Sequence, residues 1–174
     1  MQSVNSKRPE ATEYAPFYGN YVSLVGEGDV IEVLTRQLDE TLALMRGLSE
    51  NQADSRYAPD KRSIKEVLGH VTDAERIFGY RALRFARNDR TPVSGFEQDD
   101  YMRAANFGSR PLEEIATEFE HVRRANLWLF RSLDDEAWLR RGVASDNEVS
   151  VRALAYIIAG HEAHHMQIVR TRYL

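Results

Sequence analysis

Four long stretches with the pattern of amphipathic helices constrain the fold of this chain more than any other feature. In the first stretch, Ile31, Leu34, Leu38, Leu42 and Met45 recur at steps of three and four, which places them on one face of a helix. No stretch makes a convincing strand, so we expect an all-α protein folded as a four-helix bundle. The long helices are expected at about residues 29–48, 63–88, 111–133 and 150–172.

Local signals indicate where these helices begin and how they are connected. Ser63 and Glu66 form a capping-box pattern, in which the two side chains satisfy free backbone amides at a helix start. Pro111 stands at the start of the third helix, where proline is favoured. About twenty residues from Thr91 are too many for a featureless connection, so we expect a short helix near Phe96–Ala105. We expect a loop before the last helix and a simple up-down-up-down order.

Residues 1–26 lack the helical pattern and are rich in aromatic side chains, among them Tyr14, Phe17, Tyr18 and Tyr21. We interpret this segment as an extended N-terminal arm that lies on the body of the protein or on a neighbouring subunit. The remaining residues, 27–174, then form one bundle domain. A chain of 174 residues, 43% hydrophobic and 29% charged, is long enough for one domain with a sizeable core.

Charge and cysteine content limit the class of protein. The formal charge of −4 gives no basic excess, so neither nucleic acid nor an anionic membrane is expected as a main partner. Residues 81–90 include four arginines, which we interpret as a solvated helix face. The chain has no cysteine and no apolar run of signal-peptide or membrane-span length, which favours a cytoplasmic protein.

Three of the five histidines lie in one pentapeptide, residues 161–165. On a helix, His161 and His165 fall roughly 40° and 6 Å apart along a stripe that is otherwise apolar. Two buried imidazoles need partners for their polar nitrogens, and a divalent cation would use both. His164 could replace His165 as the second ligand, but His165 continues the apolar stripe and is favoured.

His70 supplies a third imidazole from the first two turns of the second helix. In an up-down-up-down bundle, the starts of the second and fourth helices share one end, so His70 and His161 would differ in height by only about 6 Å. Three neutral imidazoles suit zinc or nickel and leave a coordination position open. Such an ion can lower the pKa of bound water or hold a substrate thiolate, and the ligands alone do not decide which.

Three further side chains are candidates for a catalytic role beside such a centre. Asp73 lies on the same helix face as His70 and could act as a base or as an acceptor for a ligand imidazole. Glu162 could orient water or ligands, and His164 could face the substrate. Each is also compatible with an ordinary role on the surface of a helix.

A ferritin-like di-iron site is the competing metal hypothesis. Two glutamate–histidine pairs have the i, i+3 spacing of such sites, and two further glutamates would have to point inward. These groups are Glu118 with His121, Glu162 with His165, and the single residues Glu40 and Glu75. The arrangement leaves His70 and His161 without a role, so we favour the three-histidine site.

Three stretches of the chain, residues 57–61, 63–75 and 160–165, resemble the DinB superfamily in its YfiT-like branch of metal-dependent hydrolases. The resemblance extends from about Gly28 onward. It implies a four-helix bundle of up-down-down-up or related type, often dimeric, with His70, His161 and His165 as metal ligands. It also implies relatives that are S-transferases using low-molecular-weight thiols, or a mycothiol-dependent isomerase.

The leading functional hypothesis is a cytoplasmic, homodimeric enzyme that uses zinc or nickel to activate water or a low-molecular-weight thiol toward a small-molecule substrate. Two alternatives stay open. One is a non-catalytic, stress-related bundle in which the ion holds the fold together. The other is a metal-free scaffold for protein interactions, with the N-terminal arm as its docking segment.

Overall fold

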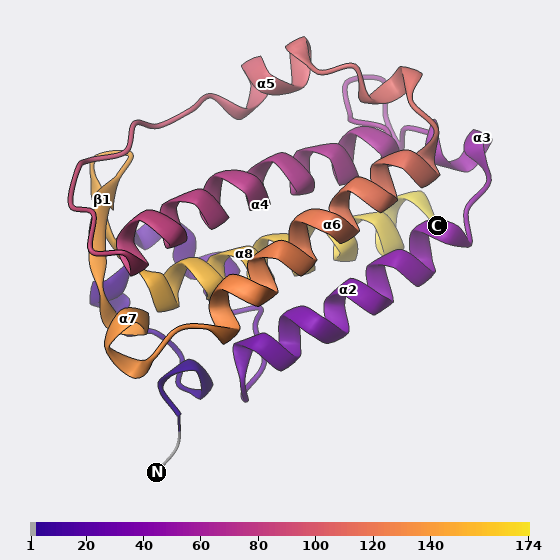
Figure 1. Ribbon diagram of the computed structural model, residues 1–174. Helices are drawn as coiled ribbons and strands as arrows, with labels where there is room; N and C mark the ends of the chain where they lie inside the picture. The colour runs from indigo at the N-terminus through magenta and orange to yellow at the C-terminus, as the bar shows by residue number, and fades with distance from the viewer. Residues whose placement is uncertain (1–2) are drawn as a thin grey trace.

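Four long helices form the body of the computed structural model, which describes residues 3–174 (Figure 1). They are α2 (Val30–Arg46), α4 (Ile64–Ala86), α6 (Leu112–Arg131) and α8 (Val151–Ile168). Helix α4 packs against both α6 and α8, and α2 packs against the same two helices from the other side. The four-helix bundle and the positions of its helices are therefore confirmed. No helix within residues 3–174 is long and apolar enough to cross a membrane.

Side-chain caps start three of the four long helices, α2, α4 and α8, where the sequence indicates. Asp29, Ser63 and Ser150 each accept a hydrogen bond from a backbone amide in the first turn that follows. The capping box of Ser63 and Glu66 is present in full. Helix α8, which carries His161 and His165, continues into a π-helical turn, Val169–Tyr173, next to the C-terminus.

The order of helix directions is up-down-down-up, so the simple antiparallel order is wrong. Figure 1 shows α2 and α8 running one way, and α4 and α6 running the other way. Residues 87–111 make this possible because they travel back along the whole bundle, through α5 (Gln98–Ala104) and a 3₁₀ turn at Phe107–Ser109. As a result, the start of α4 meets the end of α8 rather than its start. His70, in the first two turns of α4, thus lies beside His161 and His165 in the second half of α8.

A β-hairpin precedes α8, where a loop was expected. Strands β1 (Arg141–Ala144) and β2 (Asn147–Ser150) pair antiparallel through a two-residue turn. Both turn residues, Ser145 and Asp146, have positive φ angles, as in the turns that suit tight hairpins. Strands of four residues are too short to show alternation in the sequence, so the hairpin was missed.

The N-terminal segment lies on the bundle, and its extended path is broken by short helical turns. These are the 3₁₀ turns Val4–Ser6, Ala11–Glu13 and Pro16–Tyr18, and the single α-helical turn α1 (Gly19–Val22). Helix α1 packs directly on α8. The close approach depends on Gly160, because a Cβ atom there would lie only 2.0 Å from the carbonyl oxygen of Tyr21. The division of the chain at residue 26 remains a prediction.

Candidate metal centre

The imidazoles of His70, His161 and His165 meet between α4 and α8. Nε2 of His161 lies 3.1 Å from Nε2 of His70 and 3.1 Å from Nε2 of His165. The candidate ligand atoms of all three residues lie within 4.8 Å of one another. Within residues 3–174, this is the only group of three or more histidine or acidic side chains with such spacing.

The spacing of these nitrogens suits one small cation. A tetrahedral ion with nitrogen ligands at about 2.0–2.1 Å would hold neighbouring nitrogens roughly 3.3 Å apart. Hydrogen bonds alone satisfy the cluster poorly, because each neutral imidazole has one donor and one acceptor nitrogen while all three Nε2 atoms face one another. A divalent cation accepts all three lone pairs at once. The three residues therefore fit the metal that the sequence suggests.

Burial keeps these imidazoles neutral. It lowers the pKa of His70 to about 4 and that of His165 to about 3. The pKa of His161 also falls well below its usual value, first through burial and then through the neighbouring histidines. At neutral pH all three can therefore offer a lone pair, which metal coordination requires.

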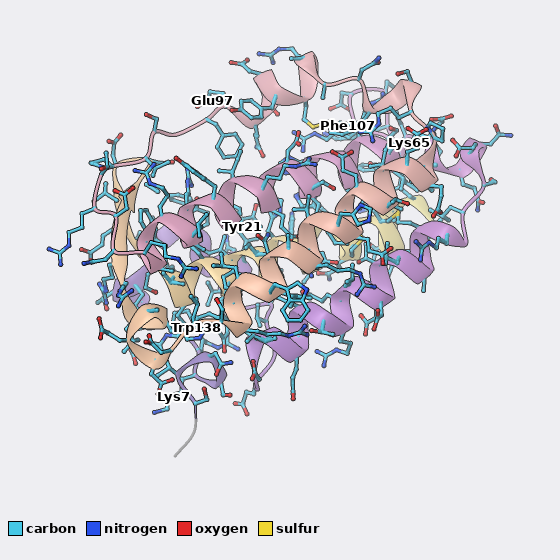
Figure 2. The ribbon with its side chains drawn as sticks, in the orientation of Figure 1. Lys7, Tyr21, Lys65, Glu97, Phe107 and Trp138 are labelled. Carbon is cyan, nitrogen blue, oxygen red and sulfur yellow. The ribbon has the colours of Figure 1, made fainter. Side chains whose placement is uncertain are left out.

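Tight backbone contacts hold the two ligand-bearing helices in place. Next to His70, Gly69 faces the ring of Phe107, which would lie 2.4 Å from an added Cβ atom. Next to His161, Gly160 admits Tyr21, whose ring makes an edge contact with the imidazole at 5.3 Å between centroids. Figure 2 labels Phe107 on the connection beside α4, and it labels Tyr21, which belongs to the α1 turn that packs on α8. Two of the three candidate ligands, His70 and His161, thus follow a glycine that admits a close aromatic residue.

Glu162, a catalytic candidate, is part of a buried ion network in the core. Its carboxylate accepts hydrogen bonds from Arg123 Nη2 at 2.5 Å and from Thr41 Oγ1 at 2.6 Å. The same guanidinium binds Glu75 through Nε at 2.6 Å and Nη2 at 2.8 Å. Arg123 is fully buried, and no pattern in the sequence indicates its role. The network joins all four long helices, since Thr41 lies on α2, Glu75 on α4, Arg123 on α6 and Glu162 on α8.

The other two catalytic candidates, Asp73 and His164, are outside the three-histidine group. Asp73 is partly buried and pairs with Arg76 at 3.4 Å, while burial raises the pKa of its carboxyl group. His164 is partly buried, and its ring lies 5.5 Å from that of Tyr21. The His164 ring also lies 5.1 Å from that of His165.

The groups required for a di-iron site do not come together in the part of the chain that the structure describes. Glu118 pairs with Arg76 and Arg110, and Glu40 with Arg36. His121 is exposed on α6. The two buried glutamates share Arg123 and are not free to bind iron. The di-iron hypothesis therefore loses its ligand set.

A cleft of about 350 Å³ opens beside His70 and His161. We call it the aromatic cleft, since its walls include Phe17, Tyr18, Tyr21, Phe78 and Phe96. His165 borders a separate hollow of about 280 Å³, whose lining includes Asp60, Lys61, Arg62 and Asp99. The three imidazoles therefore stand between two openings, and the aromatic cleft is the larger.

Arg81 also lines the aromatic cleft, and its side chain is 2% exposed. The interpretation of residues 81–90 as a solvated face is wrong for this residue. Arg81 lies eleven positions after His70, and eleven helical steps return to within about 20° of the same direction. Arg81 thus shares the inward face of α4 with His70, a relation that helical geometry could have indicated.

Together, the bundle and the three-histidine group define a class of helical proteins with a candidate metal centre between two antiparallel helices. A family model of the DinB superfamily matches residues 34–169, and the chain belongs to this superfamily. The resemblance noted from the sequence is thereby confirmed.

One solved structure with this fold is YfiT from Bacillus subtilis, described as a probable metal-dependent hydrolase with an unusual four-helix bundle topology. The match has a TM-score of 0.68 and 13% sequence identity, and it covers 95% of this chain and 93% of that chain. At this identity the likeness shows the fold. A comparison with curated proteins found no match.

Proposed function

We propose that this protein is a metal-dependent enzyme in which His70, His161 and His165 bind one divalent ion, zinc or nickel. The observation that carries the proposal is the convergence of three neutral imidazole nitrogens, 3.1 Å apart in two pairs, beside a cleft. The description of YfiT as a probable metal-dependent hydrolase supports it. Three protein ligands leave a coordination position for a reactant.

When bound, the ion would lower the pKa of a water molecule or of a low-molecular-weight thiol and so generate a nucleophile near neutral pH. The aromatic cleft would hold a small-molecule substrate against the two histidines that border it. His164 is placed near the imidazole cluster and could hold a proton during the reaction. Glu162 would keep the bundle together through Arg123 rather than act on substrate. A cytoplasmic homodimer remains our expectation from cysteine content and family resemblance.

Metal analysis of protein purified without a histidine tag tests the proposal. We expect one ion per chain in the wild type and near-complete loss in the His161→Ala/His165→Ala double variant. His121→Ala is the matched control, since this histidine is exposed on α6 and outside the site. Hydrolysis of esters and amides and transfer of thiols should disappear together with the metal. An unchanged metal content in the double variant would remove the basis for the proposal.

A further inference from the structure

Arg81 is a buried cation without a counterion. Its Nη2 atom donates to the Ser145 hydroxyl at 2.9 Å and to the Ser94 carbonyl oxygen at 3.3 Å, and both acceptors are neutral. Its Nε atom is buried and has no hydrogen-bond partner. Among the described residues, no carboxylate lies within ion-pair distance of the guanidinium. A buried charge left in this way is costly unless something else pairs with it.

The other fully buried arginine shows what a structural guanidinium looks like in this protein. Arg123 has two carboxylates, Glu75 and Glu162, and a backbone carbonyl as partners. It lies inside the core and borders neither of the two openings, whereas Arg81 lines the aromatic cleft. The contrast indicates that the partner of Arg81 comes from outside the chain.

The surroundings of Arg81 limit the chemistry of that partner. The guanidinium carbon lies 5.8 Å from the centre of the Phe78 ring and 6.0 Å from that of Phe96. Glu97 is the one acidic residue that lines the cleft; it is exposed, at the start of α5 (Figure 2). One free cation with an acidic residue nearby suits a single negative charge better than a doubly charged phosphate. The aromatic walls suit an apolar or aromatic body.

The distance between the Arg81 guanidinium and the histidines is comparable to the length of a small molecule. Phe78 is a shared neighbour, 5.8 Å from the Arg81 guanidinium and 6.2 Å from the centre of the His161 ring. These two distances limit the separation between guanidinium and imidazole to about 12 Å. A compound with a carboxylate at one end and a reacting group one ring or short chain away spans that interval.

We propose that Arg81 binds the carboxylate of the substrate, so that the protein acts on small monocarboxylic acids with an apolar or aromatic body. This inference rests on the proposed function for the reaction, but the binding itself needs only the cleft. The planar guanidinium would form charge-assisted hydrogen bonds to the carboxylate through Nε and a neighbouring N–H group. The reacting group would then point toward His70 and His161. Arg81 would act as a binding residue and take no part in bond making.

Calorimetric titration with benzoate tests this inference on protein as purified, with metal content recorded for each sample. We expect benzoate to bind the wild type, and to bind Arg81→Met about tenfold more weakly or worse. Arg87→Met is the matched control, because it removes the same charge from an exposed position at the C-terminal cap of the same helix. Benzamide, which lacks the charge, should not distinguish Arg81→Met from the wild type.

The opposite results would overturn the assignment. Equal benzoate affinity in Arg81→Met and wild type would show that Arg81 does not hold the carboxylate. Arg81-dependent binding of inorganic phosphate that is tighter than that of benzoate would show that the site prefers phosphate to a carboxylate. If Arg81→Met does not fold, Arg81→Lys retains the charge without the planar fork, and it should bind benzoate more weakly than wild type does. An unchanged affinity in Arg81→Lys would contradict the assignment. A wild type that binds benzoate but carries no metal would contradict the proposed function and leave the carboxylate site standing.

Discussion

At the scale of single residues, burial acts on the three clustered histidines and on the buried arginines, but only the histidines can respond by losing their proton. Burial disfavours charge, so His70, His161 and His165 remain neutral and offer their lone pairs. An arginine cannot lose its proton in this way and must find an anion. Arg123 pairs with the carboxylates of Glu75 and Glu162 inside the protein. Arg81 lines the aromatic cleft, where a ligand can supply the anion.

Protonation of these histidines gives a prediction for the metal-free protein. Their pKa values in the folded state, about 4 for His70 and about 3 for His165, lie below the usual 6.5. The unfolded chain therefore binds more protons between about pH 4 and 6.5, and stability should fall as pH falls through this window. The expected slope is at most about 1.4 kcal/mol per pH unit for each histidine.

Urea unfolding at several pH values measures this slope. His165→Leu should reduce the slope because one linked group is removed, whereas His121→Leu removes an exposed histidine and serves as the control. An identical slope in His165→Leu and wild type would show that this imidazole titrates alike in the folded and unfolded states.

At the scale of secondary structure elements, two short segments far apart in sequence position the site. Helix α1 lies on α8 through Gly160, and the turn at Phe107–Ser109 lies on α4 through Gly69. Periodicity in the sequence predicts neither contact, because both involve single turns with no repeating pattern. The short helix near Phe96–Ala105 was predicted from connection length alone, and α5 confirms it.

Gly160 gives a prediction at this scale. In Gly160→Ala, the new Cβ atom would lie 2.0 Å from a backbone oxygen of Tyr21, so α1 must move away from α8. We expect a loss of about 1–3 kcal/mol in the free energy of unfolding, typical of an overpacked contact, and weaker metal binding because Tyr21 leaves the face of His161. Thermal unfolding and metal titration measure the two effects.

Gly47→Ala provides a matched control for that substitution. Gly47 ends α2 with a negative φ angle, and an added Cβ atom would meet its neighbours at an ordinary 3.4 Å. Little change is expected there. A Gly160→Ala protein as stable as wild type, with unchanged metal affinity, would show that α1 does not need this close contact.

At the scale of the whole molecule, the candidate metal joins two antiparallel helices that belong to different halves of the chain. Removal of the ion by a chelator should therefore lower the melting temperature. An ion present at a hundred times its dissociation constant contributes about 2.7 kcal/mol to stability. Differential scanning calorimetry with and without chelator measures the change, and the His161→Ala/His165→Ala variant should not respond.

Activity assays on the same samples separate an enzyme from a purely structural metal protein. Turnover that depends on the metal in wild type favours the enzyme. A large loss of stability with no turnover in ester, amide or thiol-transfer assays would favour the non-catalytic alternative. A chelator without effect on wild-type stability would contradict a metal shared by α4 and α8.

Local chemistry in the sequence determined the four long helices, the capping box at Ser63 and the stripe that carries His161 and His165, because helix formation depends on neighbours within a few residues. Tertiary structure alone decided the rest. The direction of α6 follows from where residues 87–111 travel, and the burial of Arg81 and Arg123 follows from which helices surround them. A charged residue on a helix has the same local sequence pattern whether its side chain meets water or lines a cleft. Only the packing of distant segments decides which of these environments it has.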